Sequence, residues 1–197
     1  SYSYANGNPI TLKDPTGLFG EWGGRSIAGF GTHQYVYWKP DRPDLVNYAA
    51  LGIPAGTKEF TMGFYAPSSG YLEAGIYYPG SENTLGQSDF AGHDQRRSLG
   101  RTMEIGGLSG EAEAQAINTM GGALGDYNNS SVIYPSTGAT LRGTGVNSNS
   151  GINTLANIAN LQSSFNSFNP PGWSSGANLL LPAQSFNSAS IQKQVTI

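Results

Sequence analysis

The stretch TGVNSNSGINTL, residues 144–155, places two Asn-Ser pairs directly before a segment with a helical pattern of apolar residues. The apolar residues of that segment recur every three or four positions: Ile152, Leu155, Ile158 and Leu161. This spacing predicts a helix that begins near Ser150. Asn and Ser are common at helix N-termini because their side chains accept hydrogen bonds from free main-chain N–H groups. One residue is enough for a cap, so four favour either a loop or a nucleophile held at the helix start.

The composition excludes several classes of function. The 197 residues carry a formal charge of −3, and charged residues make up 12% of the chain, against roughly 25% in an ordinary soluble domain. Nucleic acid is therefore not expected as a partner, because phosphate binding needs a dense basic patch and the best candidate is His93–Arg101. The absence of cysteine excludes disulfides, thiolate metal sites and a cysteine nucleophile. His93 and Asp94 supply too few ligands for a metal, and we expect no cofactor.

The order of the predicted elements indicates the α+β class. Aromatic and β-branched runs predict strands, and apolar spacing with acidic residues in the first turn predicts a helix. The predicted strands are 33–38, 59–65, 71–78 and 130–135, and the predicted helices are 109–124 and the one that follows Ser148. Strands that come early with helices in the second half favour an antiparallel sheet with packed helices.

Two side chains form the first candidate for chemistry. The chain has two histidines, and His33 begins the best predicted strand, while His93 falls in a polar segment beside Asp94. Ser148 would lie at the positive end of the second helix, where free main-chain N–H groups stabilise a developing oxyanion. A strand-borne imidazole that meets this serine would make a nucleophile and base. The alternative is that Ser148 and its neighbours are ordinary helix caps.

The first eighteen residues, SYSYANGNPITLKDPTGL, differ from the rest and contain two turn signals. The segment resembles the closing signature of the Rhs/YD-repeat core, YxYxxNNPxxxxDPxGL. The matching residues are Tyr2, Tyr4, Asn6, Asn8, Pro9, Asp14, Pro15, Gly17 and Leu18. Gly7 stands where the first Asn of NNP is usual.

The resemblance implies two parts of the chain. Residues 1–18 would be the end of a β-cage carrier, cut after the DPxGL motif, and residues 19–197 a polymorphic-toxin effector domain. Such a domain would be secreted and delivered into a target cell in interbacterial or anti-host competition. The implied partners are the parent Rhs cage and a cognate immunity protein.

A second resemblance concerns residues 33–173. A histidine on an early strand followed by Asn-Ser-Asn at a helix start resembles the circularly permuted papain-like hydrolases, which include the PPPDE peptidases and the lecithin:retinol acyltransferase-like enzymes. Residues 147–149 match their Asn-Cys-Asn with serine in place of cysteine, and Gly151 stands where a bulky residue is common. Related toxin-associated sequences carry GxNSNT and then PPGW, which Gly145–Asn149 and Pro170–Trp173 fit.

This resemblance implies a permuted papain-like fold and a hydrolase or acyltransferase acting on an amide, ester or thioester. Ser148 would be the nucleophile and His33 the base, with Asn147, Asn149 or main-chain N–H groups at the oxyanion. In papain-like folds the third residue follows the histidine strand, which nominates Glu59 or Thr61. Membrane lipid, peptidoglycan peptide and protein side chains are all compatible substrates. The serine is either native or a replacement of a catalytic cysteine.

Two other functions stay open at the level of sequence. Glu111-Ala112-Glu113 resembles the E-x-E pair of ADP-ribosyltransferase toxins, with Arg25 available as their arginine, but no S-T-S strand motif is present. Acidic residues in the first turn of a helix are the ordinary explanation of this pair. A non-enzymatic binding toxin would leave His33 and Ser148 unlinked.

Overall fold

The computed structural model describes residues 19–27, 31–135, 145–172 and 174–196. The predicted Rhs-core segment, residues 1–18, lies outside this part of the chain, as does Trp173 of the PPGW motif. The division at residue 18 therefore stays a prediction.

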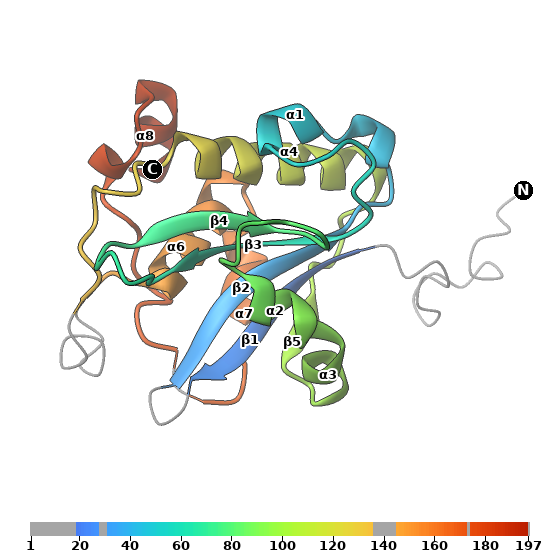
Figure 1. Ribbon diagram of the computed structural model, residues 1–197, viewed down its shortest axis with the longest axis horizontal. Helices are drawn as coiled ribbons and strands as arrows, with labels where there is room; N and C mark the ends of the chain where they lie inside the picture. The colour runs from blue at the N-terminus through green and yellow to red at the C-terminus, as the bar shows by residue number, and fades with distance from the viewer. Residues whose placement is uncertain (1–18, 28–30, 136–144, 173, 197) are drawn as a thin grey trace, which may run out of the picture.

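A five-stranded antiparallel sheet forms the centre of the domain, with strand order β4-β3-β2-β1-β5 (Figure 1). Its strands are β1 Phe19–Ile27, β2 Gly31–Lys39, β3 Phe60–Tyr65, β4 Glu73–Tyr77 and β5 Thr102–Glu104. Strands β1 and β2 form a long hairpin in which Arg25 lies opposite His33. The α+β class and the antiparallel sheet with packed helices are thus as predicted.

Helices cover both faces of this sheet (Figure 1). They are α1 Tyr48–Leu51, α2 Gln87–Ala91, α3 His93–Ser98, α4 Gly110–Asp126, α6 Ser148–Ile158, α7 Gln162–Ser167 and α8 Ala189–Val195, with 3-10 turns η2 Pro43–Leu45 and η3 Ala183–Ser185. As drawn, α6 lies behind the sheet and α4 above it, in contact with α6, while α2 and α3 lie in front. Within the described residues, no helix is long and apolar enough to span a membrane.

Alternation along the strands separates the two faces. Val36, Met62 and Phe64 point to the α4 and α6 side and are fully buried in the main core. His33, Tyr35 and Tyr37 occupy the opposite face, where α2 and α3 cover them. Because both faces are covered, β2 is buried from residue 32 to residue 38, which explains its nearly continuous run of aromatic and β-branched residues.

The first turn of helix α6 lies beside β2 where the pairing of β2 with β3 ends. The two strands pair only between residues 36–38 and 60–62. Beyond that point, the Gln34 N–H donates to Asn149 Oδ1 at 2.7 Å, and Asn149 Nδ2 donates to the Thr32 carbonyl at 2.8 Å. The side-chain amide of Asn149 thus takes the hydrogen bonds that a neighbouring strand would otherwise take, which ties the first turn of α6 to β2.

The Asn-Ser stretch also caps α6. Asn147 is the N-cap, and its side chain accepts from the N–H groups of Asn149 and Ser150, while the Ser150 hydroxyl accepts from the Asn147 N–H. This reciprocal pair is a capping box. Helix α6 therefore begins at Ser148, two residues before the predicted start.

Several expected elements differ in the structure. The predicted strand 130–135 is a single β-bridge between Ile133 and Tyr71, and Ile133 is 73% exposed. Leu161 lies beyond the end of α6, at the N-cap of α7. The polar segment around His93, predicted as a loop, forms α2 and α3. Strands β1 and β5 were not predicted, because their glycine-rich and short sequences lack a period-2 apolar pattern.

Two glycine-to-alanine substitutions should move stability in opposite directions. A Cβ on Gly151 would lie 2.2 Å from Cδ2 of the fully buried Phe64, so Gly151→Ala should destabilise the fold by about 1–3 kcal/mol through overpacking. Gly122 is an exposed position of α4 where a Cβ would meet nothing within 4 Å, so Gly122→Ala should stabilise by up to about 1 kcal/mol. Urea unfolding of both variants measures the difference, and equal effects would contradict the close packing of α6 on β3.

Candidate active site

The side chains of Ser148 and His33 meet at the start of α6. The Ser148 hydroxyl lies 3.1 Å from Nδ1 of His33, although 115 positions separate the two residues in sequence. Ser148 is 4% exposed and His33 is 3% exposed. The hydrogen bonds from Asn149 to β2 lie next to this contact, because Asn149 follows Ser148 and its partners Thr32 and Gln34 flank His33. The structure therefore brings together the two residues that sequence nominated as nucleophile and base.

Asp89 of α2 completes a chain of three polar side chains. Its Oδ2 lies 2.9 Å from Nε2 of His33, and Nε of Arg25 donates to its Oδ1 at 2.7 Å. An ionised carboxylate can only accept hydrogen bonds, so it fixes the proton of a neutral His33 on Nε2. The lone pair of Nδ1 then faces Ser148 and accepts from its hydroxyl, which is the arrangement of a nucleophile, a base and an orienting acid.

The charge on Asp89 is held by its neighbours. Burial, the largest influence, would raise the pKa of Asp89, but the attraction and hydrogen bonds of the neighbouring His33 and Arg25 together outweigh it, and the pKa is lowered below its ordinary value. Asp89 itself is completely buried. The carboxyl is therefore ionised at neutral pH, as its role beside the imidazole requires.

Tyr65 closes the site on the side of β3. Its ring centroid lies 5.4 Å from that of His33, and its side chain occupies the space over Gly63 and Gly86, where a Cβ would collide with the hydroxyl. Burial, followed by the nearby Asp89, raises the pKa of Tyr65 well above its ordinary value. The neutral phenol ring thus packs beside the imidazole.

The structure puts Asp89, and not Glu59, at His33. The Glu59 carboxylate instead accepts a hydrogen bond from the Tyr37 hydroxyl. Tyr37 is four residues from His33 on β2, which is about 13 Å along the strand. Thr61, the other nominated residue, is fully buried on β3. Neither side chain contributes a hydrogen bond to the imidazole.

Asn147 and Asn149 have positioning contacts rather than free donors. Nδ2 of Asn147 donates to the carbonyl and hydroxyl of Ser175. Nδ2 of Asn149 donates to the carbonyls of Thr32 and Ser175. Both amides are thus occupied by the protein itself. Among the described groups at the helix start, the Ser148 N–H makes no hydrogen bond to another residue, so it is the donor best placed for an oxyanion.

A second buried network holds the segment that carries Asp89. His93 of α3 bonds through Nδ1 to the Tyr35 hydroxyl at 2.9 Å and through Nε2 to Glu21 at 2.6 Å. Nε of Arg96 donates to the same Tyr35 hydroxyl at 2.7 Å, and its Nη2 donates to the Asp89 carbonyl. The pKa of Glu21 is lowered, because His93 and Arg97 outweigh the effect of burial. This network fixes α2 and α3 against the β1–β2 hairpin.

The residues of the ADP-ribosyltransferase alternative lie apart. Arg25 is bound to Asp89 beside His33. Glu113 of α4 accepts a hydrogen bond from the N–H of Asp41, which follows the end of β2. Glu111 is exposed at the start of α4. The two glutamates therefore do not face Arg25 across a shared cleft, and the described residues contain no cluster suited to a metal ion.

A hollow of about 550 Å³ lies at the β4 edge of the sheet, and none of the three polar side chains lines it. It has no nucleophile beside a base. Asp89 had no distinguishing signal in the sequence, because it lies in a short polar segment with neither a motif nor a clear periodicity. The hairpin register places Arg25 opposite His33. Two basic side chains this close together need an acid between them, and Asp89 bonds both.

Comparisons of the chain with protein-family models, with curated proteins and with solved structures each found no match.

The lowered pKa values of the buried acids predict acid sensitivity. A carboxyl whose pKa is lower in the fold stabilises the fold fully above its unfolded pKa, about 4 for Asp, and this contribution is lost as the pH falls through the folded value. The free energy of unfolding should therefore fall below about pH 4. Asp89→Asn should lower it by about 1–3 kcal/mol at pH 7 and make the remaining decline less steep.

Urea unfolding between pH 2 and pH 7 measures this dependence. Asp94→Asn is the matched control. Asp94 lies on α3 and forms an ion pair with Arg97, but its own side chain is 90% exposed. This substitution should change the stability little. An identical pH dependence of the wild-type protein and Asp89→Asn would contradict the proposed ionisation of Asp89.

Proposed function

We propose that residues 19–197 are a toxin effector domain of the Rhs type with a circularly permuted papain-like fold, acting as a hydrolase or acyltransferase. The observation that carries the reaction is the placement of His33 between Ser148 and Asp89, at 3.1 Å and 2.9 Å. Buried polar networks also serve structural purposes alone, as the one around His93 does here. The first network differs because its last member is a hydroxyl at the positive end of a helix.

The geometry supports acyl transfer through a covalent intermediate. Ser148 Oγ would attack the carbonyl carbon of the substrate as its proton passes to Nδ1 of His33. Asp89 would stabilise the resulting imidazolium without taking the proton. The Ser148 N–H would donate to the oxyanion, and the imidazolium would then protonate the leaving amine or alcohol. Water or another acceptor, deprotonated by His33, would release the acyl group.

The toxin context rests on the Rhs-like signature of residues 1–18. On this proposal the domain is delivered into a target cell and is blocked by an immunity protein. Amides, esters and thioesters of lipids, peptidoglycan peptides or proteins are the candidate substrates. Serine is a weaker nucleophile than cysteine and depends fully on its base, so the completeness of the Ser-His-Asp arrangement favours a serine that is native to the site.

Covalent labelling tests the nucleophile without knowledge of the substrate. A fluorophosphonate probe should add one phosphonyl group to Ser148, located by mass spectrometry of the digested protein. His33→Ala should slow this labelling about a thousandfold or more, because the hydroxyl loses its base. Ser130→Ala, which removes an exposed hydroxyl remote from His33, should label at the wild-type rate. Labelling spread over several serines would contradict the assignment of Ser148.

Expression in a susceptible bacterium tests the biological role. The wild-type domain should arrest growth, and Ser148→Ala, His33→Ala and Asp89→Asn should each restore it while remaining folded by circular dichroism. Killing by the Ser148→Cys variant alone would instead identify the serine as a silenced cysteine. Undiminished killing by both alanine variants would refute the proposed site.

A further inference from the structure

Strand β4 has an open outer edge over the second half of its length. It pairs with β3 on one side, where Ala74 lies opposite Phe64 and Ile76 opposite Met62. The Ala74 N–H donates to the side chain of Asn129 and so points away from β3. Because hydrogen-bonding direction alternates along an antiparallel strand, the N–H and carbonyl of Ile76 also point outward. The described residues provide these two groups with no hydrogen-bond partner.

Upstream of Ala74, the same edge is bonded to an extended segment of this chain. The Leu72 N–H donates to the Val132 carbonyl at 2.8 Å, and the Tyr134 N–H donates to the Gly70 carbonyl at 2.9 Å. The bridge between Tyr71 and Ile133 is antiparallel. Pairing stops at the side chain of Asn129, beyond which the edge is open at Ile76. The main chain here is therefore placed to bind an added strand.

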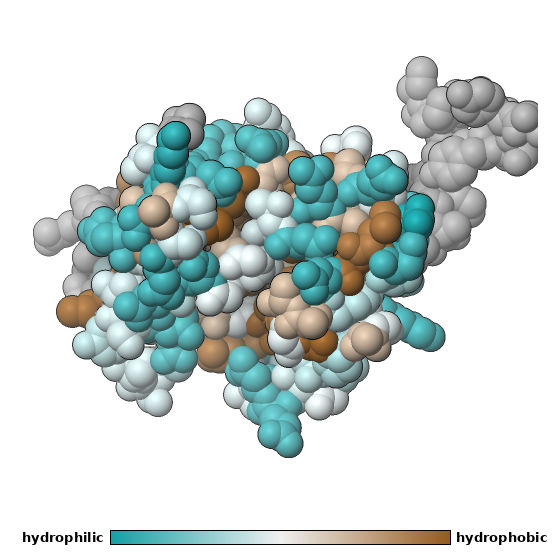
Figure 2. Space-filling model, turned by 90° about the horizontal axis from the view of Figure 1, so that it is seen from above, coloured by the Kyte–Doolittle hydropathy of each residue, from teal (hydrophilic) through white to brown (hydrophobic). Residues whose placement is uncertain are grey.

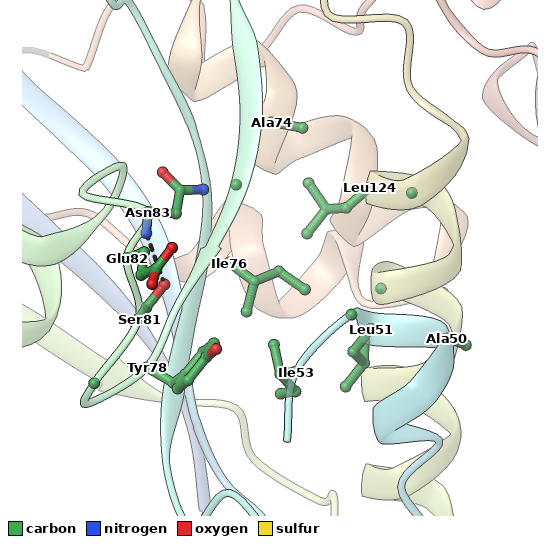
Figure 3. Close-up of a pocket in the computed structure, with 15 residues that line it drawn as sticks. Ala50, Leu51, Ile53, Ala74, Ile76, Tyr78, Ser81, Glu82, Asn83 and Leu124 are labelled. Carbon is green, nitrogen blue, oxygen red and sulfur yellow. Dashed lines mark hydrogen bonds between the residues drawn. The ribbon is translucent and has the colours of Figure 1, made fainter. Parts of the chain in front are cut away.

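The 550 Å³ hollow follows this open part of the edge. Figure 3 shows Ile76, Ile53 and Leu124 pointing toward one another on one side of β4, with α4 flanking them on the right. Ser81, Glu82 and Asn83 lie on the other side of the strand. Seen from above, the molecule shows hydrophobic residues in the hollows between hydrophilic ones (Figure 2). An added strand would thus have on one side the half-buried Ile76 above the buried Ile53 and Leu124, and on the other side a polar wall with the exposed carboxylate of Glu82.

We propose that this edge binds an extended, basic peptide segment of a partner protein as an additional strand of the sheet. Alternate residues of the segment would face opposite walls. Apolar side chains would face Ile53 and Leu124, and the intervening Lys or Arg side chains would face Glu82. Main-chain hydrogen bonds to Ile76 would provide affinity, and the two walls would provide sequence preference.

Charge favours such a partner over a second copy of this chain. Edge-to-edge pairing of two β4 strands would bring two copies of Glu73 and Glu82 together at the same sheet edge, between two proteins that each carry a charge of −3. Like charges at a strand pair are unfavourable. A segment with Lys or Arg at alternate positions instead complements Glu82, and its apolar residues cover Ile76.

A designed peptide tests the surface directly. The probe is a fluorescein-labelled heptapeptide of alternating Val and Lys, added to the full chain and followed by fluorescence anisotropy and by ¹H–¹⁵N NMR. The Ile76 amide should exchange rapidly with solvent in the free protein. On peptide binding its resonance should shift and its exchange should slow, whereas the Met62 amide, inside the sheet, should change little.

Charge reversal provides the matched control. Glu82→Lys should weaken binding of the Val-Lys peptide about fivefold and should strengthen binding of a Val-Glu peptide by a similar factor, the scale of one exposed ion pair. Glu104→Lys makes the same change on β5 at the opposite edge and should leave both affinities unchanged. A peptide with proline at its central position should not bind, because it lacks a donor for the ladder.

Three results would overturn the proposal. The first is failure of the Val-Lys peptide to bind at 1 mM or to shift the Ile76 resonance. The second is an equal effect of Glu82→Lys and Glu104→Lys, which would show attraction by net charge alone. The third is protection of the Ile76 amide that rises with protein concentration without peptide, which would identify a second copy of the chain as the occupant.

Discussion

The structure depends on one side-chain amide. Asn149 bonds the N–H of Gln34 and the carbonyl of Thr32, at the point where β2 no longer has β3 beside it. The two bonds satisfy buried main-chain groups. Without these bonds, each unpartnered group would destabilise the fold by about 1–3 kcal/mol. They also fix the first turn of α6 relative to β2, because Thr32 and Gln34 are the residues on either side of His33. The short distance between Ser148 and His33 follows from this constraint rather than from their own contact.

The four residues Asn147–Ser150 have four different roles. Asn147 and Ser150 form the capping box, Asn149 connects the helix to the sheet, and Ser148 is the residue left to face the imidazole. Gly151 lets the helix approach Phe64 closely enough for these bonds to form. A cap alone thus explains half of the polar run, and the rest is explained by attachment and by the candidate chemistry.

The sequence predicted the elements whose patterns are local and strong. The strands around His33, Phe64 and Ile76 and the helix α4 have clear periodicity, and the pairing of Ser148 with His33 followed from their places on a helix start and a strand. Asp89 and the network around His93 were missed because their helices have five and six residues, too few for a periodic signal. Their positions are set by tertiary contacts with Arg25, Tyr35 and Glu21, which no local pattern encodes.

The three polar side chains come from parts of the chain that are far apart. His33 and Asp89 are separated by 56 positions, and His33 and Ser148 by 115. Loops of this length close late, since their conformational entropy is lost before the contacts compensate for it. In a chain that has not yet folded, the serine and the imidazole are therefore not held together. If the domain has the proposed activity, its reactivity would begin only when folding has brought these side chains together.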